Sequence, residues 1–214
     1  MKKKILLVTP GTFHYFELAK ALIKKKQLNK IISGYPKFKL TKYNLSKKYL
    51  ISSGFYQIIF QILKKLRINL FNSLESTIQI LNFINLDKLS KKYLDQTSIL
   101  LSLSGCGVES GKLFKKKNKI FICERSSSHI LFANKILKKK YKKYKINFSI
   151  DQRIIKRELA EYKNADFVLV PSKFVEKTFK DYNFYNTKVL SFLSNKKIFK
   201  MINKNKNRFY GNNF

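Results

Sequence analysis

Residues 4–23 read KILLVTPGTFHYFELAKALI, and this stretch decides the class of fold. It opens with an uninterrupted apolar run that stops at Pro10 and Gly11, which is typical of a parallel strand buried on both faces. Apolar residues then recur at roughly helical spacing from about His14 to Lys26, and residues 30–33 have the composition of a second strand. The stretch therefore predicts a strand, a glycine turn, a helix and a strand, which together form one βαβ unit.

Strand-like and helix-like segments alternate along the rest of the chain. The predicted strands are short, apolar and bounded by turn or charged residues: Ser98–Leu103, Lys119–Cys123, Asp166–Val170 and Thr187–Ser191. Helical patterns cover Leu45–Leu94, Phe132–Tyr144, Asp151–Lys163, and a segment that Ser172 caps and that runs to about Phe179. The alternation predicts an α/β fold with a Rossmann-like parallel sheet flanked by helices, in which ligands bind beyond the carboxyl ends of the strands.

Basic residues dominate the charge of the chain. Its 214 residues include 46 Lys and Arg against 12 Asp and Glu, which gives a formal net charge of +34. Such a field attracts polyanions. Only five of the basic residues are arginine, however, and the guanidinium is the group suited to bidentate recognition of phosphates and bases. Nucleic acid is therefore not the favoured partner, although a non-catalytic basic module that binds membranes or nucleic acid remains the alternative interpretation.

One predicted helix has the pattern of a membrane-surface helix. Its apolar face would consist of Phe55, Ile58, Ile59, Ile62 and Leu66, and its basic end of Lys64, Lys65 and Arg67. A basic amphipathic helix with aromatic residues suits an anionic membrane surface, whereas the same spacing also suits a helix packed on its own sheet. An anionic membrane is thus a candidate partner.

The amino-terminal segment and the two cysteines indicate the cellular compartment of the protein. The apolar run that follows the first lysines is only about five residues long, too short for the core of a signal peptide or for a membrane span. Cys106 and Cys123 lie in or beside apolar runs without CxxC spacing, so we expect reduced core thiols and no metal site. These features predict a cytoplasmic protein. The amphipathic helix also allows peripheral attachment at the inner face of the membrane.

Two of the segments that follow predicted strands are rich in glycine. In the first, Gly11 and Thr12 place backbone amides where a phosphate could bind, although the full GxGxxG pattern is missing. The second, Ser104–Gly111, fails the test for a phosphate-binding Walker loop, because Cys106 replaces the first glycine and Leu113 replaces the magnesium-binding hydroxyl. A kinase or ATPase is therefore excluded.

A third segment, Glu124–His129, concentrates an acid, a base and three serines after a buried strand. Polar groups at this density cost desolvation unless they bond to one another or to a ligand, which makes His129 the best single candidate for chemistry. The serines are not hydrolase nucleophiles, because the chain lacks a GxSxG elbow. Glu158 and Glu161, on a charged predicted helix, are expected to be solvated.

Residues 151–179, DQRIIKRELAEYKNADFVLVPSKFVEKTF, resemble the helix, Ala-Asp, apolar strand and Pro-Ser turn of family 4 glycosyltransferases, which have the GT-B fold of two Rossmann-like domains. Three further segments are similar to a subgroup that acts on bacterial cell-surface glycans: Phe13–Leu22 with Gly34–Pro36, Ser104–Gly107 and Ser127–Ile130. The resemblance implies a nucleotide-activated sugar donor, a glycan or lipid-linked acceptor, and transfer with retention. It implies no cofactor beyond the nucleotide-sugar substrate.

The resemblance also assigns roles to residues. His129, by its match to Ser-Ser-His, would contact the donor sugar or the reacting centre, and Gly11 and Thr12 would lie near the donor diphosphate. The candidates on the acceptor side are His14, Glu124, Arg125, Ser128 and Ser172.

The chain departs from the family at its carboxyl-terminal end. We expect residues 1–195 to form the amino-terminal, acceptor-side domain and residues 196–214 a basic flexible tail, with no counterpart of the donor-binding domain. Leu193 replaces the glycine of the crossover segment in relatives. Since stabilisation of the leaving diphosphate normally comes from the donor-binding half, we expect the chain to be inactive alone. A separate donor-domain subunit is then a candidate partner, and a structural remnant without ligand is the other reading.

Overall fold

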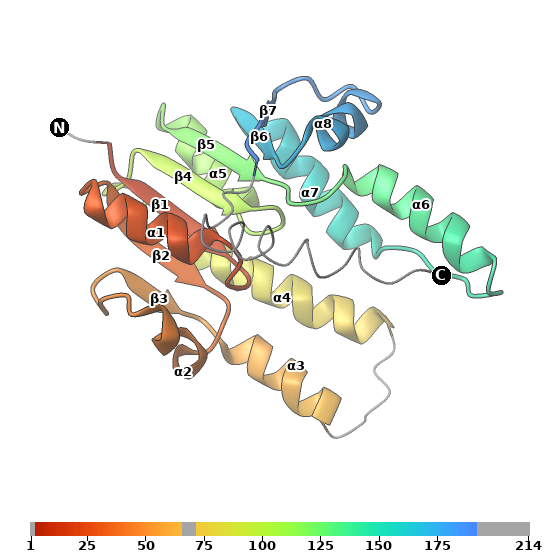
Figure 1. Ribbon diagram of the computed structural model, residues 1–214, viewed down its shortest axis with the longest axis horizontal. Coiled ribbons are helices and arrows are strands. Elements are labelled where there is room, and N and C mark those ends of the chain that lie inside the picture. The colour runs from red at the N-terminus through yellow and green to blue at the C-terminus, as the bar shows by residue number, and fades with distance from the viewer. Residues whose placement is uncertain (1–2, 66–71, 192–214) are drawn as a thin grey trace, which may run out of the picture.

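The computed structural model describes residues 3–65 and 72–191 of the chain. In this part of the chain, seven strands form one sheet in the order β3-β2-β1-β4-β5-β6-β7 (Figure 1). The strands are β1 Ile5–Thr9, β2 Leu28–Ser33, β3 Leu50–Ser52, β4 Ile99–Leu103, β5 Ile120–Glu124, β6 Phe167–Val170 and β7 Thr187–Val189. Every pairing is parallel, so the predicted Rossmann-like parallel sheet is confirmed.

Helices connect the strands. They are α1 Tyr15–Lys24, α2 Lys37–Leu40, α3 Phe55–Lys65, α4 Asn72–Lys91, α5 Val108–Lys116, α6 Ile130–Lys142, α7 Gln152–Asn164 and α8 Lys173–Lys180. Side chains cap two of these helices, and the cap by Ser172 is the one expected from the sequence. The Asp151 carboxylate accepts a hydrogen bond of 2.8 Å from the Arg153 amide at the start of α7, and the Ser172 hydroxyl accepts one of 3.3 Å from the Val175 amide in α8.

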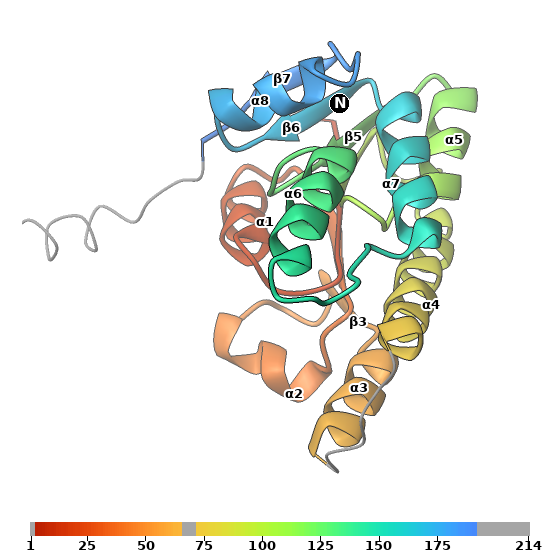
Figure 2. The same ribbon diagram turned by 90° about the vertical axis from the view of Figure 1, so that its right-hand side faces the viewer.

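Helices cover both faces of the sheet, with α1 on one face and α4, α5 and α7 on the other (Figure 2). Leu7 of β1 and Phe16 of α1 belong to one core cluster, whereas Leu6 of β1 and Phe114 of α5 belong to the second. All four side chains are fully buried. The first strand therefore has no polar face, which is why its sequence is an uninterrupted apolar run rather than an alternating one.

The strand order changes direction at β1. The chain runs outward from β1 to β2 and β3 on one side, and then returns to place β4 on the other side of β1. Between the carboxyl ends of β1 and β4 the following loops diverge to opposite faces, and this leaves a crevice in doubly wound sheets. The topology therefore marks the β1 and β4 loops as the place for a ligand.

The structure corrects one secondary-structure prediction. The helical pattern assigned to Leu45–Leu94 contains β3, in which Leu50 and Ile51 pair with Ile31 and Ile32 of β2. Three residues have too little periodicity to be separated from a helix, and only the open edge of β2 makes the extended conformation favourable.

Some features that the sequence suggested fall outside the described residues. They are Leu66 and Arg67 of the basic amphipathic pattern, Leu193 of the crossover and the tail at 196–214. Within residues 3–65 and 72–191, no helix is long and apolar enough to cross a membrane.

The two cysteines are free and fully buried. Burial raises the pKa of each thiol well above its ordinary value, with the neighbouring Glu161 carboxyl as the next cause. A protonated, buried thiol is a poor nucleophile and a poor metal ligand. Both residues therefore belong to the core, as the sequence predicted.

Candidate functional site

A cleft of about 340 Å³ lies at the switch point of the sheet, between the loops that follow β1 and β4 and the helices α3 and α4. Its apolar and aromatic lining consists of Pro10, Phe13, Tyr56, Phe60, Ile78, Phe83 and Leu103. Its polar lining consists of Gln57, Glu75, Gln79, Asn82, Ser104, Arg125 and Glu158. A concave mixture of rings and a few polar groups is typical of a site for a small polar molecule.

The loop between β1 and α1 forms one rim of the cleft. Gly11 is buried, and its carbonyl accepts a hydrogen bond of 2.9 Å from the Ser33 hydroxyl of β2. Phe13 lines the cleft with a ring that is 55% exposed, and its backbone has a φ of 40°, a left-handed conformation that costs a non-glycine residue energy. Thr12 between them is half-buried. The loop therefore exposes the aromatic side chain of Phe13 to solvent, and the backbone of this residue is strained.

His14 and Glu124, two predicted acceptor-side residues, meet at this edge of the sheet. His14 Nε2 lies 3.1 Å from Glu124 Oε2, although the two residues are 110 positions apart in the sequence. The His14 side chain is 33% exposed and that of Glu124 only 7%. Their chain neighbours Phe13 and Arg125 line the cleft, whereas His14 and Glu124 themselves are not among its lining residues. A histidine held by a buried carboxylate is the arrangement of an oriented general base.

Arg125, also a predicted site residue, forms part of the cleft wall. Its guanidinium donates to Glu158 Oε1 at 2.8 Å and to the Ser104 hydroxyl at 3.2 Å, and its Nε donates to the Ser128 carbonyl at 3.2 Å. Burial disfavours its charged form, yet interaction with Tyr162 and Glu158 raises the pKa of Arg125. The cleft wall therefore contains a fixed cation whose charge is largely offset by Glu158.

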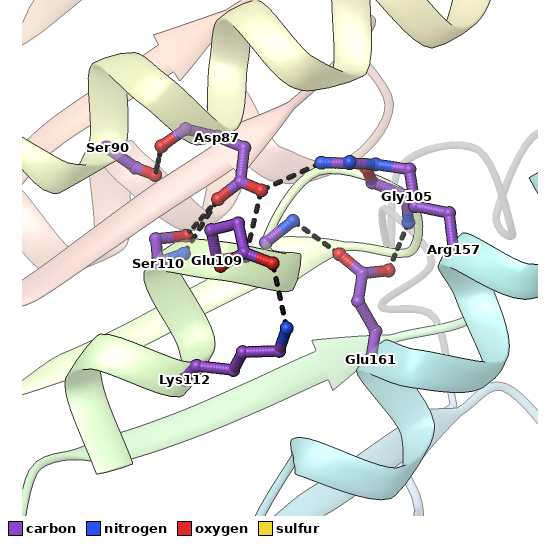
Figure 3. A network of polar contacts seen from close by, with 9 residues as sticks. Asp87, Ser90, Gly105, Glu109, Ser110, Lys112, Arg157 and Glu161 are labelled. Atoms are coloured by element: carbon purple, nitrogen blue, oxygen red, sulfur yellow. Dashed lines mark hydrogen bonds and ion pairs between the residues drawn. The ribbon is translucent and has the colours of Figure 1, made fainter. Parts of the chain in front are cut away.

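Glu158 and Glu161 correct the sequence analysis, which expected them to be solvated. Both are buried, and Glu161 has no exposed surface. The Glu161 carboxylate accepts hydrogen bonds from the amides of Gly105 and Gly107 in the loop before α5 (Figure 3). Burial raises the pKa of Glu161 to about 8, against these two hydrogen bonds, which favour its charged form.

Asp87 of α4 completes the same network (Figure 3). Its carboxylate accepts from the amides of Glu109 and Ser110 at 2.9 Å each, and from Arg157 at 2.8 Å. The helix dipole and the free amides at the start of a helix favour anions. Here the protein's own carboxylates take that place, so the glycine-rich loop after β4 has no amide cluster left for a phosphate, in agreement with the failed Walker test.

His129, the predicted catalytic residue, lies in the core. It is fully buried and stacks on Tyr182 at a ring distance of 4.7 Å, with Phe179 edge-on at 4.9 Å. Its Nδ1 accepts from the Leu131 amide at 3.4 Å, which caps α6. Burial, followed by the charge of Arg125, lowers the pKa of His129 to about 4. The ring is neutral at pH 7 and, in this arrangement, is not among the residues that line the cleft.

The remaining predicted residues are placed as follows. Ser172 caps α8, and Ser128 presents its carbonyl to Arg125. Neither serine is among the residues that line the cleft, whereas Arg125 is. The structure thus brings His14, Glu124 and Arg125 together at one edge and leaves His129 and Ser172 outside that group.

Sequence reasoning missed the polar residues that α4 presents to the cleft. Glu75, Gln79 and Asn82 follow one another at spacings of four and three, so they share one face of the helix. Asn82 is 6% exposed, and its Oδ1 has no hydrogen-bond partner among the described residues. One signal in the sequence could have identified them: one acid and two amides lie at helical spacing within an otherwise apolar face.

No family model matches the chain, and no curated protein matches its sequence. Solved structures do match. The apo structure of Phytolacca americana UGT2 aligns with a TM-score of 0.54 and 10% identity, over 94% of this chain and 54% of that one. The same protein complexed with UDP-2fluoro-glucose and pterostilbene aligns with a TM-score of 0.51 and 8% identity, over 89% and 53%. UDP-N-acetylglucosamine 2-epimerase from Rickettsia bellii aligns with a TM-score of 0.49 and 7% identity, over 100% and 50%.

At these identities the two UGT2 matches, whose TM-scores exceed 0.5, establish the fold alone. The chain spans about half the length of each of these structures.

Proposed function

We propose that the described domain is the acceptor-side half of a nucleotide-sugar-dependent glycosyltransferase, in which His14 is the general base. The observation that supports this most directly is the His14–Glu124 contact of 3.1 Å beside the cleft at the switch point. In this proposal Arg125 and the polar face of α4 bind the acceptor. A second Rossmann-like unit, on the same polypeptide or on a separate subunit, binds the donor.

The chemistry follows from the pair. With its Nε2–H donating to the Glu124 carboxylate, the imidazole has its basic lone pair on Nδ1. In the proposed step, that nitrogen accepts the proton of an acceptor hydroxyl as the hydroxyl oxygen forms a bond to the anomeric carbon of the donor. The bond from that carbon to the nucleoside diphosphate breaks, and the diphosphate leaves with the electron pair. The buried carboxylate then stabilises the imidazolium that forms, which is the part an oriented acid plays beside a histidine base.

The lining of the cleft suits a carbohydrate or another hydroxylated acceptor. Aromatic rings such as Tyr56 and Phe60 offer flat apolar surfaces, and Gln57, Gln79 and Asn82 offer amides that both donate and accept hydrogen bonds. The unpartnered Oδ1 of Asn82 is a ready acceptor for a ligand hydroxyl, because a buried polar atom without a partner is costly. The similar UGT2 structure is complexed with UDP-2fluoro-glucose and pterostilbene, which supports the proposal of a nucleotide-sugar donor.

Three finer points rest on the family resemblance. They are a donor diphosphate near Gly11 and Thr12, a lipid-linked or cell-surface glycan acceptor, and retention at the anomeric carbon. The geometry favours a different stereochemical course, because a base that deprotonates the acceptor serves direct displacement, which inverts the configuration. NMR of the anomeric proton in the product distinguishes the two.

Transfer assays with matched variants test the proposal. The protein, alone and mixed with a candidate donor-binding subunit, is incubated with UDP-sugars and hydroxylated acceptors. Once transfer is detected, His14→Ala is expected to lower its rate by about a hundredfold with the fold intact, since a general base contributes at least about that much. Glu124→Gln lowers it less, because a neutral amide still orients the ring but stabilises the imidazolium weakly.

Glu17→Gln is the matched control, since Glu17 lies on the same helix and its side chain is 70% exposed. Its rate should equal that of the unchanged protein. Full activity in His14→Ala would remove His14 from the mechanism. Absence of both transfer and acceptor binding under all pairings would overturn the proposed function itself.

A further inference from the structure

Helices α2 and α3 lie at one end of the domain (Figure 2), and exposed apolar side chains line the groove between them. Phe38 of α2 is 66% exposed, and Phe55, Ile58 and Ile62 of α3 are 66%, 40% and 51% exposed. We call these four residues, with the lysines around them, the α2–α3 surface. The alternative that the sequence left open, a helix whose apolar face packs wholly on its own sheet, does not account for them.

The four side chains are not scattered. One groove between α2 and α3 is lined by Phe38, Phe55 and Ile58, and a second, continuous with it, by Phe38, Ile58 and Ile62. Pro36 contributes to both grooves. Contiguous apolar patches of this kind are uncommon on a surface that only faces water, and they indicate an interaction site.

The charge around the patch has one sign. Lys37, Lys39 and Lys42 beside Phe38, and Lys65 at the end of α3, are exposed, and Lys39 and Lys65 line the same groove as Ile62. The sequence from residue 18 to residue 74 contains no Asp or Glu. The patch is therefore apolar at its centre and basic at its rim, and the residues that line its two grooves include no Asp or Glu.

This combination separates possible partners by their chemistry. A nucleic acid offers phosphates and base faces, for which arginines and stacking rings are suited, whereas Ile58 and Ile62 are aliphatic and the basic residues at the rim that the structure describes are lysines. A bilayer with anionic headgroups offers phosphates above an apolar interior. Lysines can bind the phosphates while apolar side chains enter the apolar interior.

We infer that the α2–α3 surface docks on an anionic membrane, with Phe38, Phe55, Ile58 and Ile62 entering the boundary of the acyl chains and the four lysines contacting the headgroups. The inference does not depend on the proposed function, because it uses neither His14 nor the donor. It also has a geometric consequence: Tyr56, Gln57 and Phe60 of the same α3 line the cleft. Docking places the cleft within about the 10 Å diameter of one helix from the lipid surface.

A single tryptophan locates the docking surface. The chain contains no Trp, so Phe55→Trp reports from one site. With vesicles of phosphatidylcholine and phosphatidylglycerol in equal amounts, its fluorescence should shift to the blue and be quenched by brominated acyl chains. Ile136→Trp is the matched control, because Ile136 is 47% exposed on the lysine-rich α6, away from the patch. Its fluorescence should not change.

Charge variants test the rim. Lys37→Gln, Lys39→Gln and Lys65→Gln together should lower the partition onto these vesicles by about tenfold or more, since each lysine near an anionic surface contributes about a fivefold change. The matched triple variant is Lys138→Gln, Lys139→Gln and Lys142→Gln on α6, which removes the same charge. Its partition should fall by less than about threefold, through the long-range field alone.

Three results would overturn the inference. The first is an equal loss of partition in both triple variants, which assigns binding to the total charge. The second is a spectrum of Phe55→Trp that vesicles leave unchanged. The third is that the protein binds duplex DNA more tightly than vesicles and that the α2–α3 triple variant abolishes this DNA binding. The surface would then be a nucleic-acid site. Circular dichroism of each variant confirms that the fold is retained.

Discussion

The two histidines of the chain occupy equivalent local positions and have opposite environments. His14 and His129 each follow a loop after a parallel strand and each is the N-cap residue of the next helix. The His129 ring accepts the Leu131 amide and is packed among aromatic rings, whereas the His14 ring makes no cap hydrogen bond and lies 3.1 Å from Glu124. One ring stabilises the fold, and the other is half exposed at the cleft.

The difference lies in what packs above each loop. Over His129, the chain returns in α8 and the turn after it, so that Phe179, Tyr182 and Phe184 enclose the ring. The His14 side chain, by contrast, is 33% exposed, and the neighbouring Phe13, which lines the cleft, is 55% exposed. A histidine after a strand end is thus a weak predictor of chemistry by itself, and its accessibility decides.

Replacing each histidine by alanine should separate the two roles most clearly. His129→Ala is expected to lower the free energy of unfolding by about 3 kcal/mol, because it leaves a cavity among four rings and an uncapped amide. His14→Ala should lower it by less than about 1 kcal/mol, as for a partly exposed pair. Urea denaturation of both variants gives the comparison. Equal losses would mean that His14 is structural as well.

The pH dependence of stability should also reflect His129. Its pKa in the folded protein is about 4, below the ordinary 6.5, so the unfolded chain takes up the proton first. The stabilising contribution is fully present above about pH 6.5 and is lost as the pH falls through the folded-state pKa near 4, to a total of about 3 kcal/mol. His129→Phe keeps an aromatic ring and cannot titrate. Urea unfolding between pH 7 and pH 4 should therefore show a smaller loss in the variant, and parallel curves would contradict the assignment.

The backbone of the His129 loop depends on a single hydroxyl. Thr178 Oγ1 accepts from the His129 amide at 3.0 Å and donates to the Val175 carbonyl at 2.7 Å, and the site is buried. Thr178→Val should lower the free energy of unfolding by about 2 kcal/mol, because it leaves a buried amide without a partner. Ser126→Ala is the matched control, since the contact of its hydroxyl with Glu124 is 3.4 Å long. Its effect in the same denaturation experiment should be below about 0.5 kcal/mol.

A small effect on stability is expected at Phe13. Glycine adopts its left-handed conformation without strain but loses more entropy on folding, so Phe13→Gly should change the free energy of unfolding by less than about 1 kcal/mol. The same change removes an exposed ring from the cleft and should weaken acceptor binding, which isothermal titration measures. A large loss of stability would show that the β1–α1 loop is packed as tightly as the loop of His129.

Several of these features were accessible from the sequence. The apolar run at the amino terminus and the alternation of elements predicted a parallel α/β sheet, and Ser172 was predicted to cap a helix; the structure confirms both. Composition and loop position also named His14, Glu124 and Arg125 as site residues. Their contact was not predictable, because 110 residues separate His14 from Glu124 and only the strand order brings β1 and β5 to one edge.

The burial of Glu158 and Glu161 shows where local reasoning is wrong. A run of charged residues on a helix is solvated unless the tertiary structure supplies partners, and here Arg125, Tyr162 and the glycine amides before α5 do so. The hydropathy pattern of a strand or helix can be seen in its own short segment of sequence, whereas the hydrogen-bond partner of a buried polar group can come from any other strand or helix. The pattern of apolar residues therefore determined the sheet and its two covered faces by itself. Which histidine is open, which carboxylates are buried and which apolar residues stay exposed at the α2–α3 surface were decided only by the packing of distant segments, because accessibility is a property of the assembled layers.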